Sequence, residues 1–269
     1  MEFSSIRRLT QKKLGTYSIF KDATFKEKGE LHILDRSTFS GLTVLTILLI
    51  GVLALSLNIQ PAKGWTGTVY IRADGSIEPA DAPIITCDNV TYTLTDNITS
   101  SADGIVVERD NIVIDGAGYT LQGTGIGTGI VLSGRTNVTV QNTQIKNFYY
   151  GIRLDDSNNN SISGNNIANN DDGIHLSLSS NNSICGNNIT ANEGYGIWLG
   201  WSSNNSICGN TFTNDGLYIY SSYQNVVEDN TVNGKPLVYL EGASDTSVME
   251  AGQVILVSCN SIRVENLSL

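Results

Sequence analysis

A short phrase occurs four times in the second half of the chain and constrains the fold more than any other feature. Its copies are NSISGNNI, NSICGNNI, NSICGNTF and NVVEDNTV, which begin at Asn160, Asn182, Asn205 and Asn225. The starting asparagines are 22, 23 and 20 residues apart. A repeat of this length, rich in Asn and Gly and with β-branched residues at fixed offsets, is typical of one turn of a solenoid.

A second phrase, Gly-Ile-x-Leu, has the same period and indicates where the strands lie. The next core aliphatic residue always follows its glycine by 11 residues, as from Gly151 to Ile162, and another follows five residues later. Only the segment that leads to the next glycine varies in length. Stacked strands must keep their register, because a slip of one residue exchanges buried and exposed faces, whereas a loop is free to vary. We therefore expect an all-β parallel β-helix of about seven coils between Gly104 and Leu269.

Two asparagines in each copy of the first phrase precede core aliphatic residues by two positions. Because side chains alternate along a strand, both asparagines are expected to point inward. Stacked identical amides can hydrogen-bond along the rod, which predicts a structural ladder. The ladder formed by the second asparagine of each copy consists of Asn165, Asn187, Asn210 and Asn230. A sugar-binding or metal-binding role for these asparagines is the alternative.

An apolar segment of 19 residues without a charge, at 41–59, separates two parts of opposite charge. Residues 1–40 carry a net charge of +3, and residues 60–269 carry −13. A segment of this length spans a bilayer core, and the positive-inside rule places residues 1–40 in the cytoplasm and the repeats outside. We expect a transmembrane helix or signal anchor at 41–59. Cleavage after a small residue, which would give a secreted protein, is the alternative.

The onset of the repeats divides the rest of the chain. Residues 60–103 hold two strand-like stretches around a Pro-containing loop, and we expect them to form a linker and an N-terminal cap that covers the first open edge of the solenoid. Residues 104–269 are expected to form the repeat domain. Its last core strand is followed by no capping element, which predicts a truncated rod or an edge that pairs with another chain. The oligomeric state stays open.

Several features agree with an exported protein. Eight Asn-x-Ser/Thr acceptors are compatible with a glycoprotein, although several of them simply follow the repeat. The acidic character of the outer part argues against nucleic-acid binding, which needs a basic patch.

Cys185 and Cys208 occupy the same repeat position, so a disulfide between them is geometrically feasible, and two unpaired cysteines are the alternative. No metal or cofactor is predicted, because the sequence has no Cys-x-x-Cys motif and no pair of histidines in the repeats.

The repeats, together with GKPLVYL at 234–240 and GQVILVSCN at 252–260, resemble the NosD-type family of parallel β-helix repeat proteins over about residues 65–269. The resemblance implies a right-handed, single-stranded β-helix in a bacterial or archaeal surface protein, with a carbohydrate-binding or sugar-hydrolase type of domain. It also implies a copper accessory role. The sequence supports that role little: His175 and Met249 are its only histidine and methionine beyond the apolar segment, whereas soft copper sites use clustered Cys, Met or His.

Related β-helix enzymes act on acidic polysaccharides and use paired carboxylates or a basic residue with calcium-binding aspartates. The candidate catalytic residues here are Asp171, Asp172 and His175, which could serve in acid–base catalysis by a lyase, hydrolase or epimerase. The competing interpretation is structural. Asp171 and Asp172 precede a glycine in the variable turn, which is common turn chemistry, and His175 occupies the outward position of Gly-Ile-x-Leu. Catalysis on acidic glycans is therefore the alternative function.

Outward positions of successive coils form two stripes. The first stripe consists of Arg153, His175, Trp198 and Tyr218, and the second stripe consists of Asp156, Leu178, Trp201 and Ser221. Exposed aromatic rings in a row suit sugar rings, and exposed apolar patches mark contact sites. Packing of aromatic side chains across neighbouring strands is the competing interpretation. We expect a non-catalytic protein that binds carbohydrate or a cell-surface protein through the first stripe and Trp201, that is, through Arg153, His175, Trp198, Trp201 and Tyr218.

Overall fold

The computed structural model describes residues 25–27, 30–32 and 64–265, and these ranges contain strands but no helix. No helix in the described ranges is long and apolar enough to cross a membrane. The expected transmembrane segment 41–59 and most of the expected cytoplasmic segment 1–40 lie outside the described residues.

The chain divides into two compact units, Met1–Ala62 and Lys63–Leu269. In the first unit, β1 (Phe25–Glu27) pairs antiparallel with β2 (Glu30–His32). The second unit holds all the other described strands and contains the repeats.

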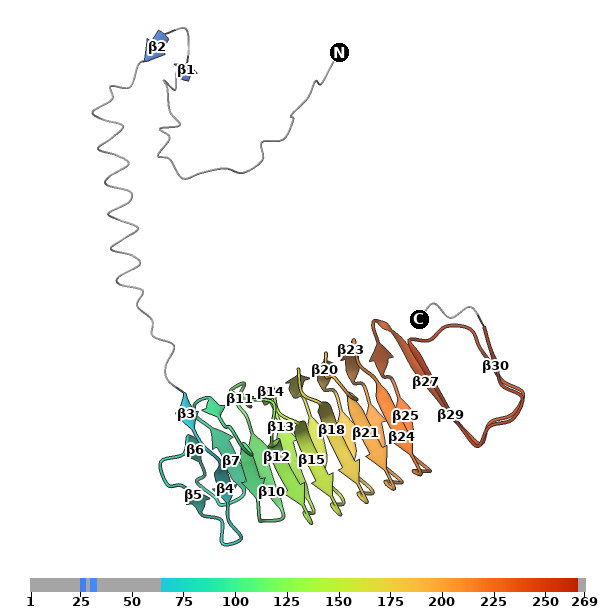
Figure 1. The fold of residues 1–269 in the computed structure, drawn as a ribbon, viewed down its shortest axis with the longest axis horizontal. Helices are drawn as coiled ribbons and strands as arrows, with labels where there is room; N and C mark the ends of the chain where they lie inside the picture. The colour runs from blue at the N-terminus through green and yellow to red at the C-terminus, as the bar shows by residue number, and fades with distance from the viewer. Residues whose placement is uncertain (1–24, 28–29, 33–63, 266–269) are drawn as a thin grey trace. The chain divides into compact units, whose positions relative to one another are not determined.

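Three sheets form the walls of the second unit, and the chain passes from one to the next in each turn (Figure 1). In order along the axis, sheet 1 consists of β5 (Ile77–Glu78), β4 (Val69–Ile71), β9 (Ile105–Val107), β12 (Thr128–Ser133), β15 (Tyr150–Asp155), β18 (Asp172–Ser177), β21 (Ile197–Gly200) and β24 (Leu217–Tyr220). Sheet 2 consists of β6 (Ile84–Ile85), β7 (Thr91–Leu94), β10 (Ile112–Asp115), β13 (Val138–Gln141), β16 (Ser161–Ser163), β19 (Ser183–Cys185), β22 (Ser206–Cys208) and β25 (Val226–Glu228).

Sheet 3 is the longest and continues past the end of the other two. It consists of β3 (Trp65–Thr66), β8 (Ile98–Thr99), β11 (Thr120–Gln122), β14 (Gln144–Lys146), β17 (Asn166–Ala168), β20 (Asn188–Thr190), β23 (Thr211–Thr213), β26 (Thr231–Val232), β27 (Lys235–Glu241) and β29 (Gln253–Val257). A separate parallel pair joins β28 (Ser247–Val248) and β30 (Arg263–Val264). The strands β9 to β26 make six regular turns, each with one strand in every sheet, which is close to the expected seven.

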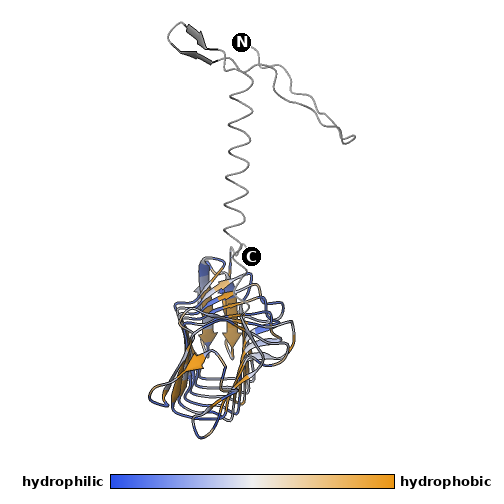
Figure 2. Ribbon diagram, turned by 90° about the vertical axis from the view of Figure 1, so that its left-hand side faces the viewer, coloured by the Kyte–Doolittle hydropathy of each residue, from blue (hydrophilic) through white to orange (hydrophobic). Residues whose placement is uncertain are grey.

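The register of the turns confirms the predicted parallel β-helix. Val140 is the partner of Ile162, Ile162 of Ile184, and Ile184 of Ile207, so equivalent aliphatic residues form one column. All four side chains are fully buried. Viewed along the axis, the successive turns superpose (Figure 2). The core is therefore a stack of like side chains that repeats with each coil.

Residues 64–103 supply the first strands of all three sheets. Two of these strands, β5 and β6, are antiparallel to their neighbours β4 and β7 and end sheets 1 and 2. They occupy the edges that would otherwise present unpaired backbone groups.

The asparagines of the first phrase form two hydrogen-bonded ladders inside the rod. In one, Nδ2 of Asn165 donates to Oδ1 of Asn187 at 3.1 Å. The same contact joins Asn187 to Asn210 and Asn210 to Asn230, at 3.0 Å each. Each Nδ2 also donates to a carbonyl of the preceding turn, such as that of Val140. Because these amides are buried and their hydrogen-bonding groups are engaged, they hold adjacent turns together.

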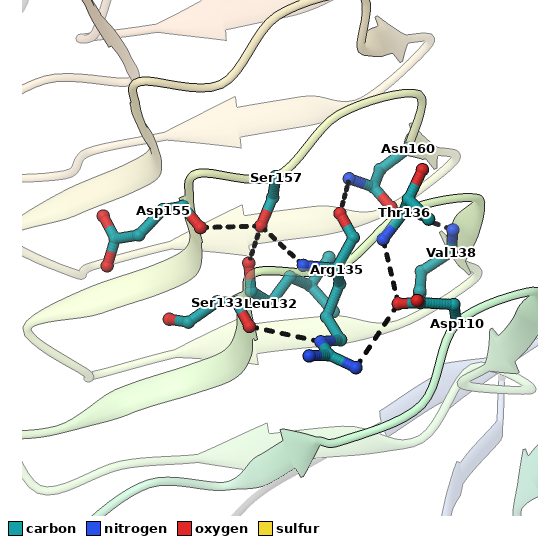
Figure 3. Close-up of polar contacts among 9 residues, drawn as sticks. All are labelled: Asp110, Leu132, Ser133, Arg135, Thr136, Val138, Asp155, Ser157 and Asn160. Atoms are coloured by element: carbon teal, nitrogen blue, oxygen red, sulfur yellow. Dashed lines mark hydrogen bonds and ion pairs between the residues drawn. The ribbon is translucent and has the colours of Figure 1, made fainter. Parts of the chain in front are cut away.

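A second asparagine ladder and a serine ladder stabilise the corner between sheets 1 and 2 (Figure 3). Nδ2 of Asn160 donates to the carbonyl of Arg135 at 3.0 Å and to Oδ1 of Asn182 at 3.1 Å. Oγ of Ser157 accepts the N–H of Arg135 at 3.0 Å and donates to the carbonyl of Asp155 at 2.8 Å. The serine ladder consists of Ser157, Ser179, Ser202 and Ser222.

A third ladder ends in a carboxylate. The N–H of Asn170 donates to Oδ1 of Asn192 at 2.9 Å, and Nδ2 of Asn192 donates to Oδ2 of Asp215 at 2.7 Å. Burial raises the pKa of the Asp215 carboxyl above its ordinary value, while hydrogen bonds from Asn192 oppose this rise. This ladder lies under the variable turn that precedes each strand of sheet 1.

Candidate functional site

Aromatic side chains gather on the outer face of sheet 1. The first stripe is in register there: Arg153 is the partner of His175, His175 of Trp198, and Trp198 of Tyr218. Ring contacts join this stripe to neighbouring aromatic residues. We call the connected group the aromatic surface, and it consists of Tyr149, Tyr150, His175, Trp198, Trp201 and Tyr220.

The centre of the aromatic surface is packed. The rings of His175 and Trp198 are stacked, with centroids 4.2 Å apart and an angle of 9° between their planes. Tyr150 covers the other side of His175, with centroids 4.6 Å apart. The Trp198 ring also lies over Gly200, where a Cβ atom would collide with it. The faces of these central rings are thus largely occupied by protein atoms, which is the cross-strand packing considered from the sequence.

The exposed rings of the aromatic surface lie at its two ends. Trp201 is 53% exposed and Tyr149 is 47% exposed. Trp201 stands nearly perpendicular to Tyr220, at 88° and 5.2 Å between centroids, and meets Trp198 edge-on at 6.4 Å. Leu178, one turn before Trp201 in the same stripe, is 61% exposed.

The backbone at Leu178 and Trp201 has an unusual conformation. Their φ angles are 51° and 50°, in the left-handed region that bulky residues rarely adopt. This conformation costs roughly 1–2 kcal/mol per residue. The equivalent residues Asp156 and Ser221 have φ angles of 47° each, so the conformation belongs to the repeat. What distinguishes this corner is that Leu178 and Trp201 present large apolar side chains to solvent from it.

Tyr218 belongs to a different pair from the one expected. Its ring stacks on Tyr195, with centroids 4.5 Å apart and 27° between the planes. Tyr195 lies in the variable loop before β21, and the repeat pattern did not single it out. Tyr195 directly precedes the glycine of Gly-Ile-x-Leu, as Tyr150 does, but the segment before it varies in length, so its ring contacts depend on how the loop folds.

The positive charge of Arg153 is neutralised by an ion pair. Its Nη2 lies 2.7 Å from Oδ2 of Asp155, and its guanidinium faces the Tyr150 ring at 5.3 Å from the centroid. The Nε atom is buried and has no hydrogen-bond partner. Arg153 is therefore an ion-paired residue beside the aromatic surface.

An open depression of about 280 Å³ adjoins Arg153. Its lining residues are Asp103, Ile126, Gly127, Thr128, Tyr149, Tyr150 and Arg153. The N–H groups of Tyr149 and Tyr150 donate to the carbonyl of Gly127, and the N–H of Thr128 donates to Oδ1 of Asp103 at 2.7 Å. Sequence reasoning missed this depression. The signal was the glycine-rich excursion at 121–129, whose Gly127 has a φ of 70° and allows the close turn.

The three candidate catalytic residues are only partly brought together. Nδ1 of His175 lies 2.9 Å from Oδ2 of Asp172, and Oδ1 of Asp172 accepts the N–H of Tyr195 at 3.0 Å. Asp172 is only 7% exposed. Asp171 contributes main-chain hydrogen bonds to the turn, to Phe148 and from Gly194.

This arrangement fixes the orientation of the His175 ring. Because Nδ1 is held by Asp172, Nε2 is the ring nitrogen that a ligand could use. Burial raises the pKa of the neighbouring Tyr150 phenol, and the charge of Tyr149 adds to the rise, so the phenol keeps its proton at neutral pH. An oriented imidazole beside a neutral phenol could exchange protons with a bound molecule.

The cysteines lie away from sheet 1. A disulfide joins Cys185 to Cys208 on the outer face of sheet 2, with their Cα atoms 4.6 Å apart. Cys87 and Cys259 are free thiols. Within 64–265 and the two short strands before it, no group of three or more His, Cys, Asp or Glu side chains could hold a metal ion.

Solved structures with a similar fold include several proteins that act on polysaccharides or occur in phage tails. A double mutant of the periplasmic alginate epimerase AlgG is 18% identical, with a TM-score of 0.48; the match covers 64% of this chain and 49% of the epimerase. An alginate lyase from Paenibacillus sp. str. FPU-7 is 15% identical, with a TM-score of 0.44 and coverage of 76% and 99%. The enzymatically active domain of bacteriophage CBA120 tailspike protein 2 is 14% identical, with a TM-score of 0.43 and coverage of 62% and 33%.

These likenesses concern the fold alone, and the chain spans about half the length of the epimerase. No curated protein sequence matches the chain. A family model described as "Right handed beta helix region" matches residues 83–266, which is more than half of the chain. The match covers all six regular turns and agrees with their parallel register. The chain therefore belongs to the family of right-handed β-helix proteins.

Proposed function

We propose that the aromatic surface of sheet 1 binds carbohydrate without catalysis. The observation that carries this proposal is the exposed position of Trp201 and Tyr220 at one end of a connected group of aromatic rings. Exposed aromatic side chains with a polar surround suit the apolar faces of sugar rings. Cross-strand packing explains the stacked centre of the surface, but it does not explain why large apolar residues are exposed at its edge.

The exposed apolar side chains support a binding role for the same corner. Leu178 and Trp201 adopt a left-handed conformation and are more than half exposed. Packing in the core would explain large apolar residues at these positions. Because both side chains are exposed, core packing does not explain them. A ligand that covers them would regain the apolar area, at roughly 25 cal/mol per Å².

The protein works outside the cytoplasm in this proposal, either tethered to the membrane by residues 41–59 or secreted after cleavage. The Cys185–Cys208 disulfide supports an oxidising compartment. The charge difference across the apolar segment supports the orientation, with the repeats outside.

Within the right-handed β-helix family, we place the chain with the NosD-type branch. The support is the GKPLVYL segment. It forms the antiparallel turn from β26 to β27, in which Val232 pairs with Lys235 and Gly234 has a φ of 78°. Metal titration of the full-length protein tests a role in copper delivery.

The test is a glycan array probed with the full-length protein and two variants. Trp201→Ala should lower the affinity for the bound glycan at least tenfold, which corresponds to about 1.4 kcal/mol. Ile85→Ala is the matched control, since Ile85 is 56% exposed on sheet 2, and it should leave binding unchanged. Silence of the whole array would remove the carbohydrate proposal, and a cell-surface protein would then be the partner to seek by pulldown.

The Asp172–His175 contact favours a second candidate, an enzyme that cleaves or epimerises a glycan on the same face. Its 2.9 Å hydrogen bond orients an imidazole beside Tyr150. Incubation of the full-length protein with acidic polysaccharides would give reducing ends if it is a hydrolase, unsaturated uronates if it is a lyase, and a changed ratio of uronate epimers by NMR if it is an epimerase. The His175→Gln variant should abolish the activity, whereas absence of product from the wild-type protein leaves binding as the function.

A further inference from the structure

We infer that the ligand is an uncharged oligosaccharide that crosses sheet 1 diagonally, from the depression beside Arg153 to Trp201. This inference rests on the proposed carbohydrate-binding function and adds the charge class of the ligand and its path. Three observations carry it: the charge of the face, the position of its exposed parts and the size of the depression.

The charge of the face disfavours an acidic glycan. Residues 60–269 carry a net charge of −13. Between β9 and β24, the strands of sheet 1 contain a single Lys or Arg, which is Arg153. That guanidinium is already paired with Asp155 at 2.7 Å. A polyanion would therefore approach a surface of its own sign and find no unpaired cation on these strands.

A carboxylate at the start of this path suits a neutral sugar. Asp103 lines the depression, and one of its oxygens accepts the N–H of Thr128. Carboxylate oxygens accept hydrogen bonds from hydroxyl groups, and such charge-assisted bonds are about twice as strong as neutral ones. Hydroxyl-rich uncharged chains thus gain where uronate chains would be repelled.

The exposed parts of the face set the path of the ligand. Tyr149 and the depression lie at the start of β15, whereas Trp201 follows the end of β21, two turns further along the axis. The strand length and two strand spacings place these ends about 20 Å apart on a diagonal. The diagonal passes over the stacked rings of His175 and Trp198, whose faces are covered and whose edges remain for contact. A flat sugar platform is therefore available at the two ends and not in the middle.

The depression limits what binds at one end. Its volume of about 280 Å³ lies just below the range of about 300–1,000 Å³ that is typical of pockets for drug-sized ligands. Its lining residues include Tyr149, Tyr150 and Ile126, whose side chains are apolar apart from the two phenol hydroxyl groups. It therefore suits one sugar unit, and an oligosaccharide must leave it across the face to reach Trp201.

The experiment compares matched neutral and acidic oligosaccharides on the full-length protein. Calorimetric titrations use cellohexaose and mannohexaose as neutral probes, hexagalacturonate as the acidic probe, and the corresponding disaccharides. Trp201→Ala and Tyr149→Ala test the two ends, and Ile85→Ala is the control. Circular dichroism and thermal unfolding of each variant show that the fold is kept.

We expect a neutral hexasaccharide to bind, with an affinity that changes less than twofold between low and high salt. Each end variant should weaken that affinity at least tenfold. The neutral disaccharide should bind more weakly and respond to only one of the two variants, because it occupies only one end.

Preferential binding of hexagalacturonate that weakens with salt would overturn the inference and leave the carbohydrate-binding function standing. Insensitivity of the hexasaccharide to Tyr149→Ala would overturn the diagonal path. Failure of both neutral and acidic probes on the array and in the calorimeter would remove the proposed function itself.

Discussion

Nδ1 of His175 lies 2.9 Å from Oδ2 of Asp172, and both residues belong to β18. The other carboxylate oxygen of Asp172 accepts the N–H of Tyr195, 3.0 Å away in the loop of the next turn. One nearly buried carboxylate thus fixes both the imidazole in the centre of the aromatic surface and the loop that carries Tyr195.

Removing this carboxylate should loosen the aromatic surface. We expect Asp172→Ala to lower the free energy of unfolding by about 1–3 kcal/mol, because the N–H of Tyr195 and the ring of His175 lose their partner. Asp172→Asn keeps an acceptor and should cost less. Chemical unfolding of the two variants and the wild-type protein checks this. If Asp172→Ala unfolds with the same free energy as the wild type, the carboxylate does not hold the loop.

The asparagine ladder should be far more sensitive than its exposed neighbours. Asn187→Ala removes hydrogen bonds to Asn165, to Asn210 and to the carbonyl of Ile162, all inside the rod. Since each buried group left without a partner costs about 1–3 kcal/mol, we expect a loss of about 3 kcal/mol or more.

The matched control for the ladder is the adjacent residue. Asn188 is exposed and makes two long side-chain hydrogen bonds: it donates to Asn166 at 3.3 Å and accepts from Thr190 at 3.4 Å. Asn188→Ala should change the free energy of unfolding by no more than about 0.5 kcal/mol. Comparable losses in both variants, measured by thermal or urea unfolding, would contradict a structural role specific to the buried column.

Asp215 should make stability depend on pH. Burial raises the pKa of its carboxyl, so the folded protein holds the proton more tightly than the unfolded chain. Stability from this group is therefore greatest at acidic pH and falls as pH rises from the ordinary carboxyl value, about 3.9, through the raised value.

The Asp215→Asn variant isolates this effect. The amide oxygen can still accept the hydrogen bonds from Asn192, but it carries no charge to bury. We expect the variant to gain stability relative to the wild type as pH increases across that window, and to keep the advantage at neutral pH. A difference in unfolding free energy that does not change with pH would contradict the assignment.

The disulfide should contribute measurably to stability. It closes a loop of 23 residues between adjacent turns, for which chain entropy predicts about 3 kcal/mol. The double replacement Cys185→Ser and Cys208→Ser copies Ser163, which occupies the same column in the preceding turn. We expect a lower melting temperature for this variant and, in the wild type, a peptide linking the two cysteines by mass spectrometry. Free thiols at both positions in the purified protein would be the contrary result.

The fold could be predicted from the sequence because each turn repeats the same constraints. The constant spacing from Gly151 to Ile162 fixes two strands and their register, and the column from Val140 to Ile207 follows from it. The two asparagine ladders followed from the inward position of amides beside core residues. The serine ladder carried the same periodic signal at Ser157 and its equivalents, but small hydroxyl residues are so common in the chain that the pattern went unrecognised.

The candidate site could be predicted only where it obeys the repeat. His175 and Trp198 were placed side by side by register, yet their stacking hides the ring faces that the sequence presented as exposed. Tyr195 and the depression near Ile126 lie in segments of variable length, where no periodicity restricts the conformation. These parts of the candidate site therefore need the three-dimensional structure.

Oxidative footprinting of the tryptophans tests the carbohydrate-binding surface most directly. The full-length protein is labelled with and without a bound glycan, and mass spectrometry compares Trp201 on sheet 1 with Trp65 on sheet 3 as an internal reference. Strong protection of Trp201 with unchanged labelling of Trp65 is the predicted result. A glycan that binds tightly while Trp201 stays fully reactive would contradict this account.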